Sequence, residues 1–325
     1  MLSLAETLAY FVVTGLLVPV AVKLPLPSAL ALGRFLGRFG YRVLRLRRSV
    51  ALSNLRFVLG ETHTPEQLEA FALESYEQFG MTAIEALRNF RNVDDSGALV
   101  EAPPEFDEMV ALNKKGQGFI ACSPHYGSFE RLAYAAAARG LRVAAVMRAL
   151  ENERFDSLIV SCRAAAGVEV LQRGRVSPYA LIERLEQGVF LGLLPDQNTR
   201  HGVSVDFLGK PARTYRGPAV LHLRSGAPLV VCVIRRLSDD PTRHRVSVRM
   251  LPVHQATGDR NADIRAITQR ICDAMSELIL EAPGQYLWMH RRWGRAASGS
   301  GARRHRRRLG RGRKPPESRA PANGR

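Results

Sequence analysis

Residues 119–130, which read FIACSPHYGSFE, decide the fold that we predict for this chain. The apolar residues that open this stretch have the composition of a buried β-strand, and Pro124 and Gly127 end that strand. The Ala-rich residues 132–138 that follow have the composition of a helix. We therefore place His125 in a turn between a strand and a helix.

This turn is predicted to bring His125 close to a carboxylate. In a continuous helix, side chains five residues apart diverge by about 140° around the axis, so His125 and Glu130 would not share a face. With His125 in the turn and Glu130 in the first turn of the helix, the carboxylate can accept a hydrogen bond from one imidazole nitrogen. The other nitrogen is then available as a base. Such a pair also arises by chance as a structural contact, so its interpretation depends on the rest of the chain.

Downstream of this turn, apolar strands alternate with helices. Strands are predicted at 142–147, 168–171 and 189–194, and the helices between them at 152–166 and 177–187. This alternation predicts an α/β fold with a largely parallel, buried sheet that is flanked by helices.

Further elements are predicted on both sides of this region. A helix with a capping sequence at its start is expected at 64–90. After the parallel region, a short helix at 217–224 leads to strands at 229–234 and 245–251, which are expected to pair antiparallel, and a helix at 259–280 closes the domain.

Polar residues follow the ends of several predicted strands. His125, Arg148 and Asp196 each lie just past a strand end. Because the carboxyl ends of parallel strands meet at one edge of a sheet and ligands bind there, one pocket can hold all three. An arginine in such a pocket suits a phosphate or a developing negative charge on an oxygen, although each of these residues also has a structural interpretation, as an ion pair or a turn.

The N-terminal residues are predicted to bind a membrane. Residues 8–22 are almost wholly apolar. A spanning helix needs about 20 apolar residues, so a short span and a helix that lies in the interface both fit this length. No basic region precedes the run and no cleavage site follows it, which argues against a removed signal peptide.

A basic amphipathic helix is predicted next. Arg34, Arg38, Arg42 and Arg45 fall on one helical face. The opposite face carries the apolar stripe Phe35, Leu36, Phe39, Val43 and Leu46. Such a helix suits an anionic bilayer interface, with its charges on the cytoplasmic side, and its apolar stripe would equally serve to pack it on the domain.

The charge of the chain is strongly positive. The 47 basic and 30 acidic residues give a net charge of +17. Residues 294–325 hold eleven Lys or Arg against Glu317 alone, which is +10, so +7 remains in the body. The basic body suits anionic lipids or an acidic carrier protein. The tail is predicted to be disordered, and it lacks the aromatic residues that stack on bases, so no specific nucleic-acid binding is expected.

Neither a metal nor a cofactor is expected. The four cysteines are far apart in the sequence, with no Cys-x-x-Cys pair and no histidine at zinc spacing. The chain also lacks a Gly-x-Ser-x-Gly elbow and the glycine-rich loops that bind nucleotides.

Four segments resemble, in order, the motifs of a known family. Residues 123–130 resemble the His-x4-acid motif of the glycerolipid and lysophospholipid acyltransferases, and they are most similar to the lipid A late (lauroyl/myristoyl) acyltransferase branch. Residues 147–152 resemble its Arg-Pro-Leu-x-Asn segment, with Ala149 in place of proline. Residues 193–214 resemble its Leu-Pro-Asp-Gln-Asp run, with Asn198 and Leu208 as departures, and residues 283–293 resemble its closing segment, with Gly284 and Trp293 as departures.

The resemblance implies a membrane-associated O-acyltransferase with a glycerolipid-acyltransferase-like α/β fold. It implies His125 as general base oriented by Glu130, with Arg148, Asp196 and Gln197 binding substrate. Acyl carrier protein would be the donor and an anionic lipid A precursor the acceptor, at the cytoplasmic face of the cell inner membrane. The corresponding organisation is an anchor at 1–25, an acyltransferase domain at 26–293 and a basic tail at 294–325.

Two alternatives accompany this interpretation. The acceptor could instead be a phosphatidylinositol mannoside, a lysophospholipid or an ornithine lipid, because relatives share the motif. A non-catalytic lipid-binding protein or membrane scaffold that keeps the fold is the alternative from another class, and the intact pair His125 and Glu130 argues against it.

Overall fold

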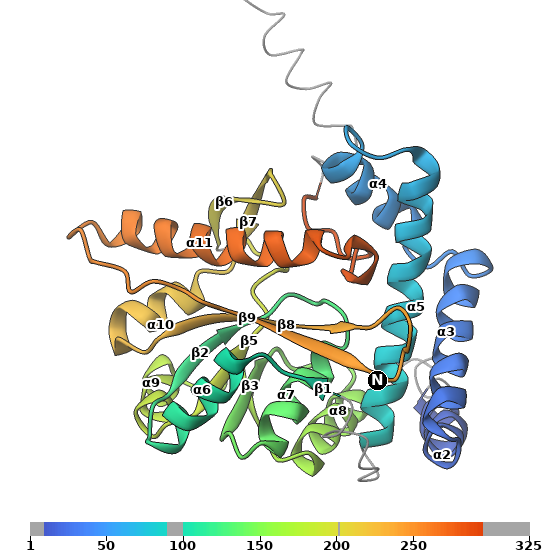
Figure 1. Cartoon of the computed structure of the whole chain (residues 1–325), viewed down its shortest axis with the longest axis horizontal. Helices are drawn as coiled ribbons and strands as arrows, with labels where there is room; N and C mark the ends of the chain where they lie inside the picture. The colour runs from blue at the N-terminus through green and yellow to red at the C-terminus, as the bar shows by residue number, and fades with distance from the viewer. Residues whose placement is uncertain (1–9, 90–99, 201, 295–325) are drawn as a thin grey trace, which may run out of the picture.

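A computed structural model describes residues 10–89, 100–200 and 202–294 (Figure 1). Its main sheet has seven strands in the order β1-β9-β8-β2-β5-β3-β4. Their bounds are β1 Val100–Glu101, β2 Phe119–Cys122, β3 Val143–Met147, β4 Val168–Gln172, β5 Phe190–Leu193, β8 Leu229–Arg236 and β9 His244–Met250. All neighbouring strands are parallel except β8 and β9. The predicted α/β fold, its largely parallel sheet and the antiparallel pairing of β8 with β9 are thus confirmed.

Helices cover both faces of the sheet because its strands bury side chains on both faces. Phe119 and Ala121 pack with α6 (Pro104–Lys114) and α7 (Phe129–Ala138) on one side. Ile120 and Cys122 belong to the core on the other side, beneath α10 (Gly217–Ser225) and α11 (Arg260–Leu280). Two further helices cross over between parallel strands, namely α8 (Glu153–Ala165) and α9 (Pro178–Glu186).

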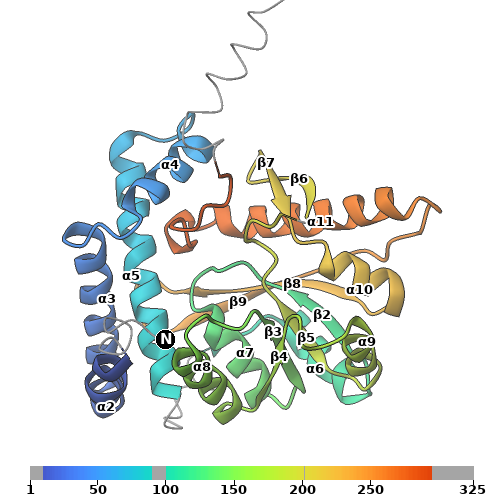
Figure 2. The ribbon, with the colours of Figure 1, turned by 180° about the vertical axis from the view of Figure 1, so that it is seen from behind.

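Helix α5 (Pro65–Asn89) stands along one side of the sheet, with α3 (Leu26–Arg42) on its outer flank (Figures 1 and 2). Its start is the predicted capping box, because Gln67 Oε1 accepts from the backbone N–H of Thr64 at 2.8 Å and Thr64 Oγ1 accepts from that of Gln67 at 3.4 Å. The predicted end at residue 90 lies outside the described residues.

Several elements were not predicted from the sequence. These are the helix α4 (Arg48–Leu59), the short strand β1 and the antiparallel hairpin of β6 (Val203–Phe207) and β7 (Lys210–Thr214). The hairpin strands are short, and each buries only two of its five side chains, so they lack the apolar runs that mark the main sheet. The hairpin packs on α11 (Figure 2).

The N-terminal residues form a π-helical turn (Val13–Leu17), α2 (Val18–Lys23) and α3. Within the described ranges, no helix combines the length and hydropathy needed to cross a bilayer. The anchor at 1–25 therefore stays a prediction, and its residues 1–9 lie outside the described part. The predicted tail lies outside it from residue 295 onward.

Glycines let α3 pack closely on α5, and of the apolar stripe only Leu36 among the described residues packs against a buried core cluster, the one that includes Ile84 of α5. A Cβ added at Gly37 would lie 2.2 Å from the carbonyl oxygen of Tyr76, and one at Gly33 would lie 2.7 Å from that of Gly80. The predicted four-arginine face is wrong at its end, because α3 stops at Arg42 and Arg45 adopts a left-handed conformation with φ of 51°. The glycines allow the two backbones to approach closely, and the rest of the stripe, Phe35, Phe39, Val43 and Leu46, stays exposed.

Candidate active site

The register of two neighbouring strands brings His125 and Asp196 together. Cys122 of β2 pairs with Leu193 of β5 in parallel register. His125 lies three residues after Cys122, and Asp196 lies three residues after Leu193. Both side chains therefore emerge at the same height at the carboxyl edge of the sheet. We predicted that His125 and Asp196 lie together at this edge, and in the structure they are in contact.

Asp196 holds His125 through both carboxylate oxygens. Its Oδ1 lies 2.7 Å from His125 Nδ1, and its Oδ2 accepts from the backbone N–H of His125 at 2.9 Å. The Asp196 side chain is 2 % exposed, whereas that of His125 is 17 % exposed. The carboxylate is thus enclosed, while the imidazole reaches the surface of the site.

His125 and Asp196 each shift the pKa of the other. Burial alone would lower the pKa of His125, but the charge and hydrogen bond of Asp196 more than offset it, and the pKa is raised. Burial alone would raise the pKa of Asp196, but His125 keeps it below its ordinary value. Asp196 is therefore ionised, and the proton on Nδ1 of His125 is the one directed to it.

The second imidazole nitrogen faces Gln197. The Nε2 atom of His125 lies 3.3 Å from Nε2 of Gln197. With the proton on Nδ1, this Nε2 carries a lone pair and accepts from the amide. Gln197 therefore marks the position that a hydroxyl group would occupy if it approached His125 as a proton donor.

Glu130 lies near His125 but is paired elsewhere. Its oxygens accept from Nε of Arg163 at 3.1 Å and from Nη2 at 2.7 Å, a two-pronged ion pair between α7 and α8. Glu130 acts on His125 through its charge, which contributes to raising the pKa of the imidazole, and Arg163 opposes this effect. In the structure Asp196, and not Glu130, contacts Nδ1.

A Glu130→Gln variant is therefore expected to lose turnover by about 10-fold or less. It removes the charge beside His125 and weakens the Arg163 pair, yet the imidazole keeps its Asp196 contact, so the loss stays below the 10²–10⁴ range for a missing general base. Steady-state kinetics on the folded variant measure it. A loss as large as that of His125→Ala would mean that Glu130 contacts the ring during turnover.

Arg148 is exposed at the carboxyl end of β3. Because β3 is next to β5 and one strand removed from β2, Arg148 emerges at the same edge of the sheet as His125. Among the described residues, no hydrogen bond or ion pair involves its guanidinium. Its guanidinium is therefore available to a ligand, and the role of Arg148 in binding substrate stays a prediction.

Residues near the end of the described chain support the turn after Asp196. His290 Nε2 accepts from the backbone N–H of Asn198 at 3.1 Å, and burial lowers the pKa of His290, which favours the neutral ring that this bond requires. Arg292, 1 % exposed, donates to the carbonyl oxygen of Gln197 at 3.3 Å and to that of Arg213 at 2.5 Å. These contacts span more than 75 residues of sequence, and only the motif around residues 283–293 hinted at them.

The thiol and the serine hydroxyls of this stretch are not prepared to act as nucleophiles. Ser123 is partly buried and donates to the carbonyl oxygen of Pro124 at 3.2 Å. Cys122 is fully buried, and burial raises the pKa of its thiol. Ser128 is fully buried and donates its hydroxyl to Glu85. In the described ranges no group of three or more His, Cys, Asp or Glu side chains is arranged to hold a metal ion. The site thus offers a base and no positioned nucleophile.

Comparison with known proteins identifies the family of this chain. The model of the bacterial lipid A biosynthesis acyltransferase family matches residues 1–295. A phosphatidylinositol mannoside acyltransferase of Mycobacterium tuberculosis is 28 % identical over 74 % of this chain and 75 % of its own length. The lipid A biosynthesis palmitoleoyltransferase and lauroyltransferase of Escherichia coli are 24 % and 25 % identical, each over 84 % of this chain and 87 % of its own length. The chain belongs to the bacterial lipid A biosynthesis acyltransferase family.

Proposed function

We propose that this protein moves a fatty acyl chain from a thioester to a hydroxyl group of a glycolipid, with His125 as general base. The observation that carries this proposal is the pair of His125 Nδ1 and Asp196 at 2.7 Å, which leaves Nε2 at the surface of the site. Asp196 takes the orienting role that the sequence had assigned to Glu130.

The chemistry follows from this geometry. Nε2 of His125 takes the proton of the acceptor hydroxyl while its oxygen attacks the thioester carbonyl. Asp196 stabilises the imidazolium that forms. As the carbon–sulfur bond breaks, the imidazolium returns the proton to the departing thiolate, so the products are an ester and a free thiol. Arg148 and Gln197 are suited to bind the phosphate or carbonyl oxygens of the substrates.

The transfer is proposed to be direct, without an acylated protein. The thiol of Cys122 and the hydroxyl of Ser128 are both buried, and the first has a raised pKa while the second is bonded to Glu85. Acyl donor, protein and acceptor must then form a ternary complex.

The proposed donor is acyl carrier protein and the proposed acceptor an anionic lipid A precursor. The net charge of the chain, +17, suits both, because the carrier is acidic and the lipid carries phosphate groups. A phosphatidylinositol mannoside is the second candidate acceptor, supported by the similarity to the mycobacterial enzyme. Lipid mass spectrometry of a strain in which the gene is deleted tests these assignments, since the acyl ester that disappears identifies chain and acceptor. An unchanged lipid profile would contradict both.

We also propose that the protein works on a membrane, at the cytoplasmic face of the cell inner membrane. The stripe on and after α3 is exposed, with Phe35 61 %, Phe39 40 %, Val43 62 % and Leu46 57 % exposed. Arg38 on the same helix bonds Glu77 of α5, which fixes the helix on the domain. Such a stripe is expected to enter the headgroup region of a bilayer.

Replacing Phe11, Leu16, Phe35 and Phe39 by Ser is expected to release the protein from anionic vesicles. Each large apolar side chain that leaves the bilayer removes roughly 1.5–3 kcal/mol of binding free energy. Vesicle sedimentation measures the bound fraction. A variant with Ser at Tyr179 and Val253, which are 77 % and 81 % exposed elsewhere on the molecule, is the matched control and should stay bound. Equal binding of both variants would place the membrane contact elsewhere.

A further inference from the structure

Helix α5 carries a buried polar stripe that its sequence did not reveal. Gln78, Thr82 and Glu85 are 9 %, 2 % and 1 % exposed. Their spacing of three and four residues places them on one face of the helix, where apolar side chains would be expected to pack. We call these three residues the polar stripe of α5.

The polar stripe of α5 contacts the loop of His125 directly. Thr82 Oγ1 donates to the carbonyl oxygen of Gly127 at 3.0 Å, and Ser128 Oγ donates to Glu85. Gly127 has φ of 54°, and a Cβ at this position would lie 2.0 Å from the carbonyl oxygen of Ile234. The loop is therefore held between α5 and β8, two and three residues after His125.

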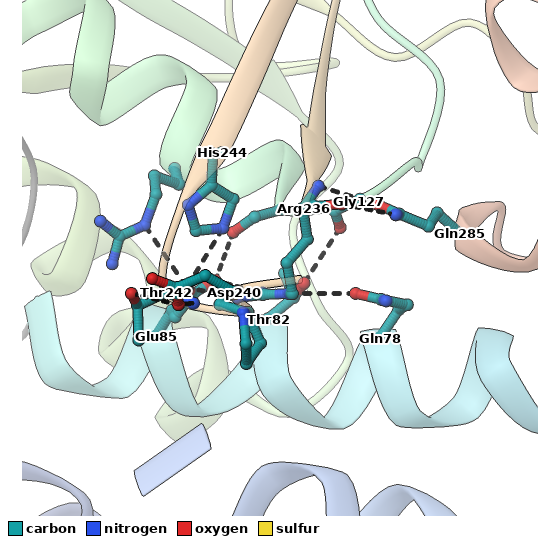
Figure 3. A network of polar contacts seen from close by, with 12 residues as sticks. Gln78, Thr82, Glu85, Gly127, Arg236, Asp240, Thr242, His244 and Gln285 are labelled. Carbon is teal, nitrogen blue, oxygen red and sulfur yellow. Dashed lines mark hydrogen bonds and ion pairs between the residues drawn. The ribbon is translucent and has the colours of Figure 1, made fainter. Parts of the chain in front are cut away.

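A buried charge cluster fixes Glu85 in turn (Figure 3). Arg236 at the end of β8 donates to Oε1 at 2.9 Å and to Oε2 at 2.7 Å, and its Nε donates to Gln78 at 3.0 Å. Nε of Arg131 lies 3.5 Å and Nε2 of His244 lies 3.4 Å from Oε1 of Glu85. Burial alone would raise the pKa of Glu85, but Arg236, His244 and Arg131 hold it well below its ordinary value, so Glu85 is ionised.

Gln285 also connects the cluster to the loop of His125. Gln285 joins the backbone of Arg236 through both ends of its amide, at 2.9 Å and 2.8 Å, and its own carbonyl oxygen accepts from the N–H of Gly127 at 2.9 Å. The adjoining segment holds His125 itself, because the N–H of Leu287 donates to the carbonyl oxygen of His125 at 3.0 Å.

Buried charges are not needed to hold α5 on the sheet. Removing charges from water costs free energy, and well-packed apolar side chains hold a helix on a sheet at least as well. Hydrogen bonds to Gly127 and Ser128, unlike apolar contacts, fix the direction of the loop and not only its distance from α5. A loop fixed in direction keeps the imidazole of His125 aligned with Asp196.

We propose that the polar stripe of α5 positions the loop of His125 for the transfer reaction, with Thr82 and Glu85 as positioning residues. The proposal deepens the function proposed above and rests on His125 being the base. Its consequence is that the loss of one uncharged hydrogen bond outside the pair of His125 and Asp196 lowers turnover without weakening substrate binding.

Two substitutions at Thr82 distinguish the effect of its hydroxyl group on turnover from the effect of its side-chain shape. Thr82→Val keeps the shape and removes the hydrogen bond to Gly127, and it is expected to lower kcat on the order of 10–10²-fold with KM unchanged. Thr82→Ser keeps the hydroxyl and removes only the methyl group, so it should resemble the wild type. Thr268→Val is the matched control, because Thr268 is equally buried but, within the described part of the chain, its hydroxyl bonds only inside its own helix, to Ile264 at 2.6 Å.

A second readout does not require turnover. The rate at which diethylpyrocarbonate modifies His125, followed by peptide mass spectrometry against pH, reports the pKa of this imidazole, because only the neutral ring reacts. In Thr82→Val the contact with Asp196 is weakened, so the profile of His125 should move to lower pH, while Thr82→Ser and Thr268→Val should match the wild type.

The outcomes separate this proposal from the function it rests on. A lower kcat and a shifted His125 profile in Thr82→Val alone support positioning by α5. Thr82→Val with wild-type kcat and profile, or Thr82→Ser as damaged as Thr82→Val, overturns it. If the wild-type protein transfers no acyl group but the profile of His125 still shifts, the positioning stands and only the acyltransferase function is lost.

Discussion

A His125→Ala variant is expected to lose a factor on the order of 10²–10⁴ in turnover while it remains folded. The imidazole supplies the base, and among the described residues Gln197 is the hydrogen-bonding neighbour on its Nε2 side. An amide cannot replace it as a base. The side chain is 17 % exposed and reaches the surface of the site, so its removal leaves no sealed cavity in the core. Steady-state kinetics with a thioester donor, combined with a thermal unfolding curve, measure both parts of the prediction.

His254→Ala is the matched control for this variant. His254 forms a similar pair with a carboxylate, with Nε2 2.9 Å from Oδ1 of Asp263, and it is also largely buried. That pair lies at the start of α11 and touches no residue of the site described above. His254→Ala should keep the turnover of the wild type. Equal losses in the two variants would show that the effect of His125→Ala is a general one.

An Asp196→Asn variant is expected to lose about 10²-fold or more in turnover. An amide can donate to Nδ1 as well as accept from it, so the imidazole is free to carry its proton on Nε2, where it no longer acts as a base. The serine protease triad, in which the same replacement leaves the wrong tautomer, provides the scale. Glu130→Gln should cost less, because Glu130 is bonded to Arg163 and not to the ring.

The pH dependence of Asp196→Asn has a defined sign. In the wild type the raised pKa of His125 sets the acid limb of kcat/KM, since the base must be neutral to act. Without the carboxylate, burial remains and lowers the pKa, so the acid limb should move to lower pH. An acid limb that stays in place or moves to higher pH would contradict the role of Asp196.

The strands of the main sheet other than β1 were predictable because a parallel sheet buried on both faces leaves apolar runs in the sequence. Phe119 to Cys122 and Phe190 to Leu193 are such runs, and β2 and β5 lie where they were expected. The edge location of His125, Arg148 and Asp196 followed from the same rule about the carboxyl ends of strands.

The sequence did not indicate which carboxylate contacts the imidazole of His125. Glu130 is five residues away in sequence and Asp196 is 71 residues away, so local spacing favoured the first. The register of β2 and β5 places Asp196 beside His125, and no local sequence pattern specifies this register. The polar stripe of α5 was hidden for a related reason, because Thr82 and Glu85 look like ordinary surface residues until their partners on β8 and in the His125 loop are known.

The hydropathy pattern of α3 did not reveal which of its faces contacts α5. Its arginines and phenylalanines formed a clear amphipathic pattern, and the glycines between them carried no hydropathy signal. The contact with α5 nevertheless uses those glycines, because backbones can approach closely only where side chains are absent. An exposed apolar stripe was thus visible in the sequence, but the face that binds the domain was not.

The most direct test of the account incubates the purified protein with an acyl thioester, first alone and then with the glycolipid acceptor. Mass spectrometry follows both the intact protein and the lipid product. We expect the wild type to keep its mass and to form the ester once the acceptor is present, and His125→Ala to form none. An acylated protein before the acceptor is added, or equal ester formation by His125→Ala, would contradict direct transfer by this histidine.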